Sequence, residues 1–370
     1  MEAFLYFLAG LIAGYFVNML SSAHAPWFQL QYRRVRRRIR RRLGWKAAPS
    51  RELLAIGSIP ISWVVLDGGH TSAYSQEALV TSCVPAHDTA LLKEFRQLRQ
   101  QIDEHETVLQ LAAGNPAWNG DRYQLVKWGL DRYMSDESPE DSRLYFQFAP
   151  SNYLNFLTSQ HLLRAIDLPS NCDALRQEVG SWHDFDRPLP YMAHSFGINL
   201  VPITSDNFVI ISERGDKVRS RSGTWNVAVN EGLQRPVDNN AYGAPDFYKA
   251  AERGIFEELG ITLGKDNRIL FLSFGVDPQL QQYGLLGLVD LSLTAEQMQT
   301  VRLMGVKDRW EAKQIQFIPL DAHSIGQALR DKKPWAPSGA VALIHALIYK
   351  EQSVRRVMAA LQSHGFVITS

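Results

Sequence analysis

The chain has 370 residues, of which 45% are hydrophobic and 21% charged, as is ordinary for a globular protein with a substantial core. The first 50 residues carry nine Lys or Arg and one acidic residue (net +8), whereas the other 320 carry 30 basic and 37 acidic residues (net −7). The acidic body excludes a duplex-DNA binder, because such proteins have a basic surplus. The basic N-terminal part predicts contact with an anionic partner.

An uncharged run of 18 residues extends from Ala3 to Leu20. As a helix it would be about 27 Å long, enough to cross a thin hydrocarbon core. A secretory signal peptide is the alternative, since residues 23–25 (Ala-His-Ala) resemble a cleavage site. The region before the run has no positive charge, and Pro26 would follow the cut. We therefore predict a single transmembrane helix over residues 1–22.

A basic segment over residues 23–50 follows the apolar run. Its nine positive charges are Arg33, Arg34, Arg36, Arg37, Arg38, Arg40, Arg41, Arg42 and Lys46. Positive charge stays on the cytoplasmic side, so the N-terminus is expected outside and the body in the cytoplasm. Apolar residues recur every four positions within this segment, and a helix here would present an arginine-covered face to anionic membrane lipids. An RNA-binding arm is the alternative, but the adjacent anchor favours lipid.

The predicted anchor has one face of small residues. Gly10, Gly14 and Asn18 lie four positions apart. Small residues let helix backbones approach closely, and an intramembrane Asn is best satisfied by a partner helix. This face predicts self-association of the anchor and a homo-oligomer, although a GxxxG spacing also arises by chance in apolar segments.

An intermediate α/β region is expected over residues 51–191, ending in a stretch rich in Trp, Asp and Pro. The periodicity predicts strands at 56–66, 122–128 and 144–148, with helices at 87–113 and 152–168. The polar stretch 135–142 is expected to separate the last two strands. The apolar stripe of the first helix indicates a core contact or a dimer seam.

A domain boundary is expected at residue 192, and from Phe196 on the sequence pattern is mostly that of strands. We expect strands at 198–203, 207–211, 224–229, 269–274, 284–290 and 315–319. A helix is expected at 245–259, closed by Gly260 as a left-handed cap, and a last helix at 338–349. The whole chain is therefore expected to be of the α+β class.

Residues 250–261 read AAERGIFEELGI. This segment resembles the second half of the Nudix box, GX5EX7REUXEEXGU with U aliphatic, in the register of Arg253, Glu257, Glu258, Gly260 and Ile261. The order of the surrounding strands and helices also resembles that family, over about residues 192–350. The resemblance implies a Nudix-like α/β/α sandwich at residues 192–370.

In the Nudix family the Arg orients carboxylates, while the Glu after it and the Glu-Glu pair bind divalent cations. Those cations bridge a diphosphate and activate water. The resemblance therefore implies metal ligation by Glu257 and Glu258, with Mg²⁺ as the cation of a residual box. An amphipathic helix with a solvated Glu pair is the plainer alternative.

The box also departs from the family at key positions. Gly254 stands in place of the first Glu of the helix, and Pro245 and Asn239 stand in place of the earlier Glu and the opening Gly. Gly254 also weakens the helix by about 1 kcal/mol relative to Ala. We therefore predict a binding surface with no catalytic residue and no required cofactor, and Asp246 is the candidate substitute if some hydrolysis survives.

An anchor joined to a Nudix-like domain resembles the transmembrane-Nudix effectors of bacterial cyclic-oligonucleotide antiphage signalling (CBASS). The resemblance implies an effector in the bacterial inner membrane that binds a cyclic oligonucleotide, oligomerises and disrupts the membrane. A membrane-tethered hydrolase of a nucleoside diphosphate derivative is the first alternative. A non-signalling interaction module at the membrane is the second.

Candidate ligand contacts come from residue chemistry. Arginines bind phosphates and aromatic rings stack on bases. The candidates are Arg214, Arg219, Arg221 and Arg253 for phosphates, and Trp225, Tyr283 and Trp310 for stacking. Solvated loop charges and core aromatics are the plainer interpretations of the same residues.

Overall fold

The computed structural model describes residues 53–56, 59–85, 93–112, 119–135, 138–164, 184–189, 192–215, 221–306, 312–332 and 334–369. The predicted anchor, its small-residue face and the basic segment lie outside the described residues. Among the helices that are described, none has the length and apolar character needed to cross a bilayer. Residues 53–369 form one compact unit.

The centre of this unit is a mixed sheet of eight strands. Six follow one another in the order β13-β8-β7-β12-β11-β3, while β10 pairs with β7 and β9 with β8. β7 and β12 are parallel, and the other pairs are antiparallel. The strands are β3 (Val64–Gly68), β7 (Phe196–Ile203), β8 (Phe208–Arg214), β9 (Trp225–Val227), β10 (Val229–Gly232), β11 (Arg268–Asp277), β12 (Gln282–Asp290) and β13 (Ala312–Pro319).

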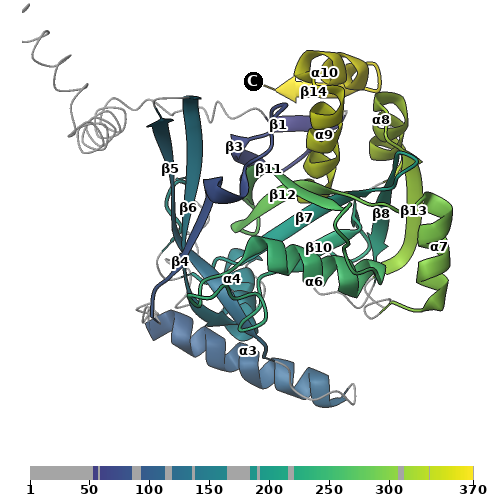
Figure 1. Ribbon diagram of the computed structural model, residues 1–370. Helices are drawn as coiled ribbons and strands as arrows, with labels where there is room; N and C mark the ends of the chain where they lie inside the picture. The colour runs from purple at the N-terminus through teal and green to yellow at the C-terminus, as the bar shows by residue number, and fades with distance from the viewer. Residues whose placement is uncertain are drawn as a thin grey trace, which may run out of the picture. The chain divides into compact units, whose positions relative to one another are not determined.

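Two helices cover opposite faces of this sheet, α6 (Phe247–Leu259) and α9 (Pro337–Glu351) (Figure 1). Along β7, Ile198 and Leu200 belong to the buried cluster that contains α6, whereas Val201 and Ile203 belong to the cluster that contains α9. Successive side chains of a strand point to opposite faces, so this alternation places the two helices in separate layers. The α/β/α layering agrees with the sandwich expected for residues 192–370.

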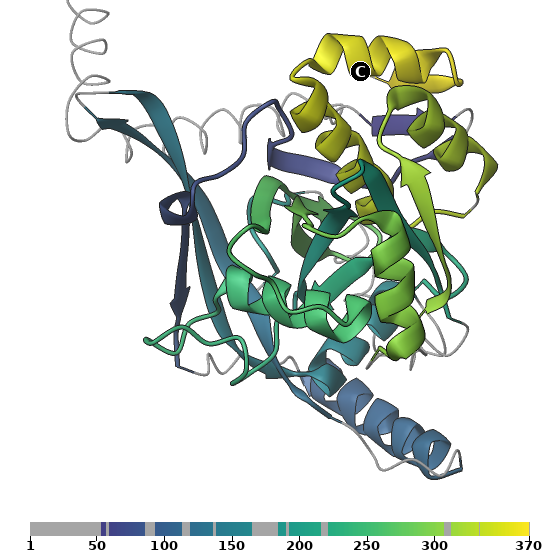
Figure 2. The ribbon, with the colours of Figure 1, turned by 45° about the vertical axis from the view of Figure 1, so that its right-hand side comes forward.

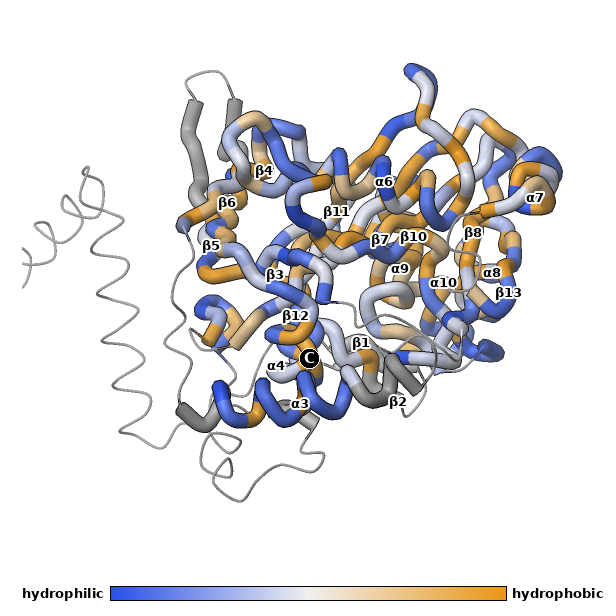
Figure 3. Tube along the Cα trace, turned by 90° about the horizontal axis from the view of Figure 1, so that it is seen from below, coloured by the Kyte–Doolittle hydropathy of each residue, from blue (hydrophilic) through white to orange (hydrophobic). Residues whose placement is uncertain are grey.

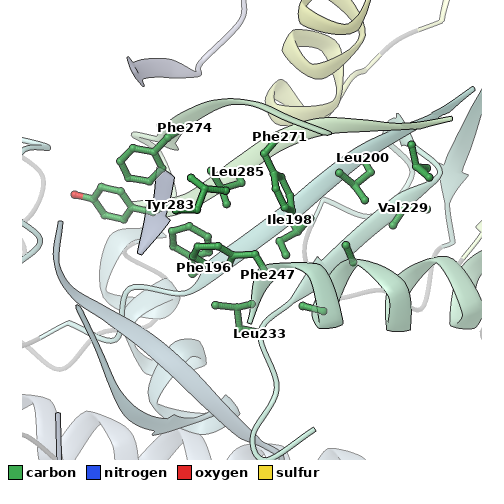
Figure 4. Close-up of a cluster of buried hydrophobic side chains, with 14 of the residues drawn as sticks. Phe196, Ile198, Leu200, Val229, Leu233, Phe247, Phe271, Phe274, Tyr283 and Leu285 are labelled. Carbon is green, nitrogen blue, oxygen red and sulfur yellow. The ribbon is translucent and has the colours of Figure 1, made fainter. Parts of the chain in front are cut away.

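The α6 face is filled by aromatic rings (Figure 4). Phe196 of β7 stacks on Phe247 of α6 with 5.2 Å between ring centroids, and Phe274 of β11 lies 6.1 Å from Phe196. Phe146 packs edge-on against these rings, 5.4 Å from Phe247. Phe146 lies in a region predicted to be separate, yet it shares their core.

That core is shared because a second, three-stranded sheet packs beside the first. It has the order β4-β6-β5, with β4 (Leu79–Cys83), β5 (Asp121–Ser135) and β6 (Ser138–Asn152). Helices α3 (Lys93–Ala112) and α4 (Tyr153–Arg164) pack on each other beside it (Figure 2). Most of α3 is polar, with isolated apolar positions (Figure 3). Leu98 and Ile102 are buried, as the predicted stripe implies.

Three expectations from the sequence change here. β5 and β6 continue into the polar stretch expected to separate them, because antiparallel pairing satisfies the backbone hydrogen bonds of both strands. The strand expected at 56–66 is broken into β1 (Leu53–Ile56), β2 (Ile59–Pro60) and β3. The regions expected at 51–191 and 192–370 share the central sheet, since β3 pairs with β11.

The C-terminal part of the chain holds more elements than the sequence predicted. The sequence did not predict four elements there, α7 (Ala295–Met304), α8 (Ala322–Asp331), α10 (Val354–Gln362) and β14 (Phe366–Thr369). Earlier in the chain, the short 3-10 helix η1 (Gln76–Ala78) was also not predicted. β14 pairs with β1, so the end of the described chain lies beside its beginning. Short elements of this kind are defined by their partners more than by their own periodicity.

Candidate functional site

The box helix α6 is fixed at both ends by side-chain and backbone caps. The Asp246 carboxylate accepts hydrogen bonds from the backbone N–H groups of Tyr248 and Lys249, at 3.0 and 3.2 Å. Gly260 has φ 74° and donates its N–H to Phe256 O at 2.9 Å, which confirms the predicted left-handed cap. Asp246, the candidate substitute carboxylate, thus serves as the N-cap.

The two sides of α6 have different chemistry. Its buried face repeats every three or four residues and consists of Phe247, Ala250, Ala251, Gly254, Ile255 and Leu259. Arg253 and Glu257, one turn apart, flank this face and form an ion pair of 2.9 Å. The helix therefore carries its box charges along the border of the core.

Arg253 is the centre of the site. Its Nε donates to Asp238 Oδ1 at 2.9 Å, and its Nη1 donates to Glu231 Oε2 at 2.7 Å and to Glu257 Oε2 at 2.9 Å. Its Nη2 donates to Gly232 O at 2.9 Å and to Asp238 Oδ2 at 3.0 Å. A guanidinium has five N–H donors, so these contacts use all of them. The Asp238 side chain, which bonds in bidentate fashion, is 0% exposed.

Gly254 faces β10 at very close range. A Cβ at this position would lie 2.2 Å from Glu231 Cγ and 3.3 Å from Val229 Cγ1. The glycine therefore permits a close approach of α6 to β10. This finding adds to the sequence interpretation, in which Gly254 was only a lost ligand and a weak helix former. A carboxylate-bearing side chain does occupy the space, but it comes from Glu231 on the strand.

The two predicted metal ligands have protein partners. Glu257 contacts Arg253, and Glu258 Oε1 accepts the backbone N–H of Asn230 at 2.9 Å. Within the described part of the chain, no group of three or more His, Cys, Asp or Glu side chains has the arrangement that holds a metal ion. The carboxylates of Glu231, Asp238 and Glu257 are arranged around the guanidinium of Arg253.

The segment before α6 is held by the second sheet. Tyr123 Oη of β5 donates to Gly243 O at 2.9 Å, and Thr81 Oγ1 of β4 donates to Pro245 O at 2.7 Å. Arg253 with Glu231, Asp238 and Glu257 is called the Arg253 cluster below. Arg122 of β5 lies near this cluster, with 3.5 Å between its Nη1 and Gly232 O. Burial lowers the pKa of Arg122, and the charge of Glu231 opposes that effect. The second sheet thus adds another guanidinium to the border of the site.

A second polar group lies where β8 and β9 connect. Arg221 forms an ion pair with Asp277 at the end of β11, and their side chains are 22% and 6% exposed. Asp277 Oδ1 also accepts the backbone N–H of Gln279 at 2.9 Å. Burial raises the pKa of Asp277, and the charge of Arg221 opposes that shift. Arg221 therefore has one carboxylate partner among the contacts described, where Arg253 has three.

Trp225 follows this connection as the first residue of β9 and is 7% exposed. Lys332 Nζ lies 4.6 Å from the centroid of its ring, a cation–π contact, and the Trp335 ring lies 6.4 Å away. Arg214, at the end of β8, donates its backbone N–H to Thr224 O at 2.9 Å. Thr224 donates its backbone N–H to Arg221 O at 3.3 Å, so the backbones of Arg214, Arg221 and Trp225 lie close together at one end of the β8–β9 connection.

The remaining candidates lie elsewhere. Tyr283 is 1% exposed, its ring stacks on Phe274 at 6.1 Å, and its hydroxyl donates to Phe185 O at 3.1 Å, so it is part of the core. Arg219 and Trp310 lie outside the described residues. The sequence interpretation missed Glu231, Asp238 and Arg122, because none belongs to the linear box. The only signal was that Asp238 immediately precedes Asn239, where the pattern has its opening glycine.

Comparison with known proteins gives a distant similarity. No protein-family model matches the sequence, and no curated protein matches it. Among solved structures, DR0079 from Deinococcus radiodurans is 13% identical, with 42% of this chain and 83% of that chain covered and a TM-score of 0.30. The MutT protein from Methanosarcina mazei Go1 is 13% identical, with 43% and 96% covered and a TM-score of 0.28. The chain thus has a distant structural similarity to a MutT protein over less than half of its length.

Proposed function

We propose that this chain is a membrane-anchored sensor whose Nudix-like domain binds a nucleotide without hydrolysing it. The observation that carries the proposal is the state of the box. Position 254 has no side chain, and all five donors of Arg253 are used by Asp238, Glu231, Glu257 and the Gly232 carbonyl. Diphosphate hydrolysis of the Nudix type needs cations held by box carboxylates, and those carboxylates are engaged.

The proposed ligand is a cyclic oligonucleotide, in keeping with the resemblance to CBASS effectors. The support from the described residues is the group formed by Arg214, Arg221 and Trp225. Arg221 could exchange Asp277 for a phosphate, because a guanidinium binds either anion in bidentate fashion. Arg219 belongs to the same connecting segment and is proposed to take part. A base could stack on Trp225 only if Lys332 moves from its ring face.

The proposed output is membrane disruption by an oligomer in the bacterial inner membrane. Ligand would favour an assembled state in which the anchors at residues 1–22 cluster through Gly10, Gly14 and Asn18. Shifting a 1:99 equilibrium to 99:1 requires about 5.5 kcal/mol of differential binding. Phosphate and stacking contacts on the order of 1–3 kcal/mol each could supply that energy.

The test uses the full-length chain in liposomes that contain anionic lipid. Cyclic oligonucleotides are screened for binding by calorimetry and for dye release. We expect binding and release together, and binding without release for a chain that lacks residues 1–46. Arg221→Met should weaken binding, whereas Arg330→Met, on an exposed part of α8, serves as the matched control.

Three results would count against the proposal. Dye release of equal strength without nucleotide would contradict the proposal that the protein senses a nucleotide. Ligand binding that never produces release removes the effector. Efficient Mg²⁺-dependent turnover of a nucleoside diphosphate compound, abolished by Glu257→Ala, establishes the tethered hydrolase in its place.

A further inference from the structure

Helix α9 begins without a side-chain cap. Ala336 holds the N-cap position and has no side-chain oxygen, and Pro337 follows as the first helical residue. The N–H of Ala336 bonds to Trp225 O at 2.8 Å, and Pro337 has no N–H. The first turn therefore presents the N–H groups of Ser338 and Gly339 without an intrahelical acceptor, at the positive end of the dipole of a 15-residue helix.

A buried amide lies against this helix start. Asn226 of β9 is 1% exposed, and a Cβ on Gly339 would collide with its Oδ1 and lie 3.0 Å from its Cγ. Asn226 Oδ1 accepts the N–H of Val227 at 2.9 Å, which fixes the orientation of the amide. Its Nδ2 is buried and has no hydrogen-bond partner in the part of the chain that the structure describes. A buried donor without an acceptor is costly, so this amide points to an acceptor from outside the chain.

A second buried donor belongs to the segment that leads into α9. Trp335 forms a parallel bridge with Trp225, and Trp225 donates its backbone N–H to Pro334 O at 2.8 Å. The indole Nε1 of Trp335 is also buried without a partner among the described residues. An indole N–H can only donate. The amide of Asn226 and the indole of Trp335 are thus two unused donors on adjoining segments at the start of α9.

The charges around this helix start favour an anion. The cation–π contact brings Lys332 Nζ to 4.6 Å from the centroid of the Trp225 ring, on the strand that carries Asn226. The carboxylates of Asp277 and Glu213 each have a cationic partner in an ion pair. The unused groups at the start of α9 are therefore all donors, and a positive charge lies beside them.

We propose that the start of α9 is a subsite for a phosphate group, bound by the Asn226 amide, the Trp335 indole and the N–H groups of the first turn. Phosphates bind at helix N-termini because the N–H groups and the dipole both favour negative charge. The subsite goes beyond the nucleotide contacts proposed above and rests on other donors. It stands for a free phosphate as well as for the phosphate of a nucleotide.

The first experiment titrates inorganic phosphate into the full-length chain, purified in detergent. Calorimetry measures the Kd, and thermal unfolding is recorded in phosphate and in chloride of equal ionic strength. We expect saturable binding, and an unfolding temperature that is higher in phosphate than in chloride.

Adenosine 5′-monophosphate and adenosine are titrated in parallel to identify the source of the phosphate. A monophosphate that binds more tightly than inorganic phosphate assigns the subsite to a nucleotide, and equal binding assigns it to free phosphate. No binding of either phosphate compound would overturn the proposal, as would adenosine binding as tightly as its monophosphate. Phosphate binding without binding of any cyclic oligonucleotide would support the subsite and count only against the proposed nucleotide ligand.

Asn226→Asp tests the buried amide. The carboxylate keeps an acceptor for the N–H of Val227 but replaces the Nδ2 donor with a negative charge, so the affinity for phosphate should fall by at least about tenfold. Gln299→Glu makes the same change at an exposed position of α7 and should leave the affinity as it is. Equal phosphate affinity in these two variants would contradict the proposal.

Trp335→Phe keeps an aromatic ring and removes the indole N–H, so it tests the subsite even if Asn226→Asp does not fold. The affinity for phosphate should fall by about tenfold, the loss of one hydrogen bond to a charged group. Trp128→Phe is the matched control, because the indole of Trp128 donates to Phe185 O at 2.9 Å. Its phosphate affinity should equal that of the wild type. The same affinity in both Trp variants would contradict the proposed indole donor.

Discussion

The α6 face and the α9 face of the central sheet both bury polar side chains, but in opposite ways. On the α6 face, Arg253 forms ion pairs with Glu231, Asp238 and Glu257. On the α9 face, His345 Nδ1 and Ser273 Oγ form a hydrogen bond of 2.8 Å, and burial lowers the pKa of His345 to about 4. One face of the sheet therefore buries ion pairs and the other buries a neutral hydrogen bond. The two groups should respond differently to mutation and to pH.

The difference follows from where the two side chains lie relative to the border of the sheet. Arg253 and Glu257 lie beside the buried face of α6, where β10 and the segment before the helix bring further carboxylates. His345 lies within the buried part of α9, and Gly69 packs so closely that a Cβ there would be 2.8 Å from the imidazole ring. A charge at that position would lack both solvent and a carboxylate, so the imidazole stays neutral.

The largest expected loss of stability comes from breaking the ion pairs of Arg253. Asp238→Ala removes the bidentate partner of Arg253 and leaves a buried guanidinium with fewer carboxylates. Breaking a buried pair from one side typically costs about 3–5 kcal/mol. The free energy of unfolding in urea measures the loss. Asp266→Ala, on an exposed turn, is the control and should stay within about 0.5 kcal/mol of the wild type. Equal values for the two variants would remove the special role of the cluster.

The next effect is the pH dependence of stability that comes from the neutral side chain of His345. An unfolded His takes up its proton near pH 6.5, whereas folded His345 does so only at about 4. Between these values the unfolded state binds more protons, so stability falls as the pH falls. The full shift corresponds to about 3 kcal/mol. His345→Gln should flatten this acid limb while lowering stability at neutral pH. Unchanged acid sensitivity in His345→Gln would show that another group controls it.

A smaller loss of stability is expected from breaking the ion pair between Arg221 and Asp277. Arg221→Met leaves Asp277 with its backbone donors and should cost about 1–3 kcal/mol at neutral pH. The loss of Arg221 raises the pKa of Asp277 further, so the penalty applies to the charged carboxylate. It should shrink as the pH falls through the folded-state pKa of Asp277, which burial raises above the ordinary value of 3.8, because the carboxyl group is then neutral in the folded protein. A penalty independent of pH would assign the cost to packing of the arginine stem.

The smallest effect gives a reference for α6 that involves no charge. Gly260→Ala places a side chain at φ 74° in the helix cap. This should cost about 1 kcal/mol. The loss should be the same at neutral and acidic pH, measured by the same unfolding experiment. A marked pH dependence would show that the cap is coupled to the Arg253 cluster.

Local patterns in the sequence predicted the elements whose signals are local. The strands at 198–203, 207–211 and 284–290 and the box helix with its glycine cap are present because apolar runs and cap residues act over a few positions. β14 and the continuation of β5 and β6 were missed, since their polar or short segments become strands only through their partners. The predictions for the membrane anchor concern residues outside those described and stay predictions.

The sequence by itself determined the register of Arg253, Glu257 and Glu258 on one helix, because helical spacing fixes which residues share a side. It also identified Gly254 and Pro245 as positions without a carboxylate. Only the tertiary structure decided which carboxylates from other parts of the chain surround Arg253. Glu231 and Asp238 reach Arg253 through the pairing of β10 with β7 and the hold of the second sheet on the segment before α6. Those contacts join residues far apart in the chain, and no local pattern encodes their distance.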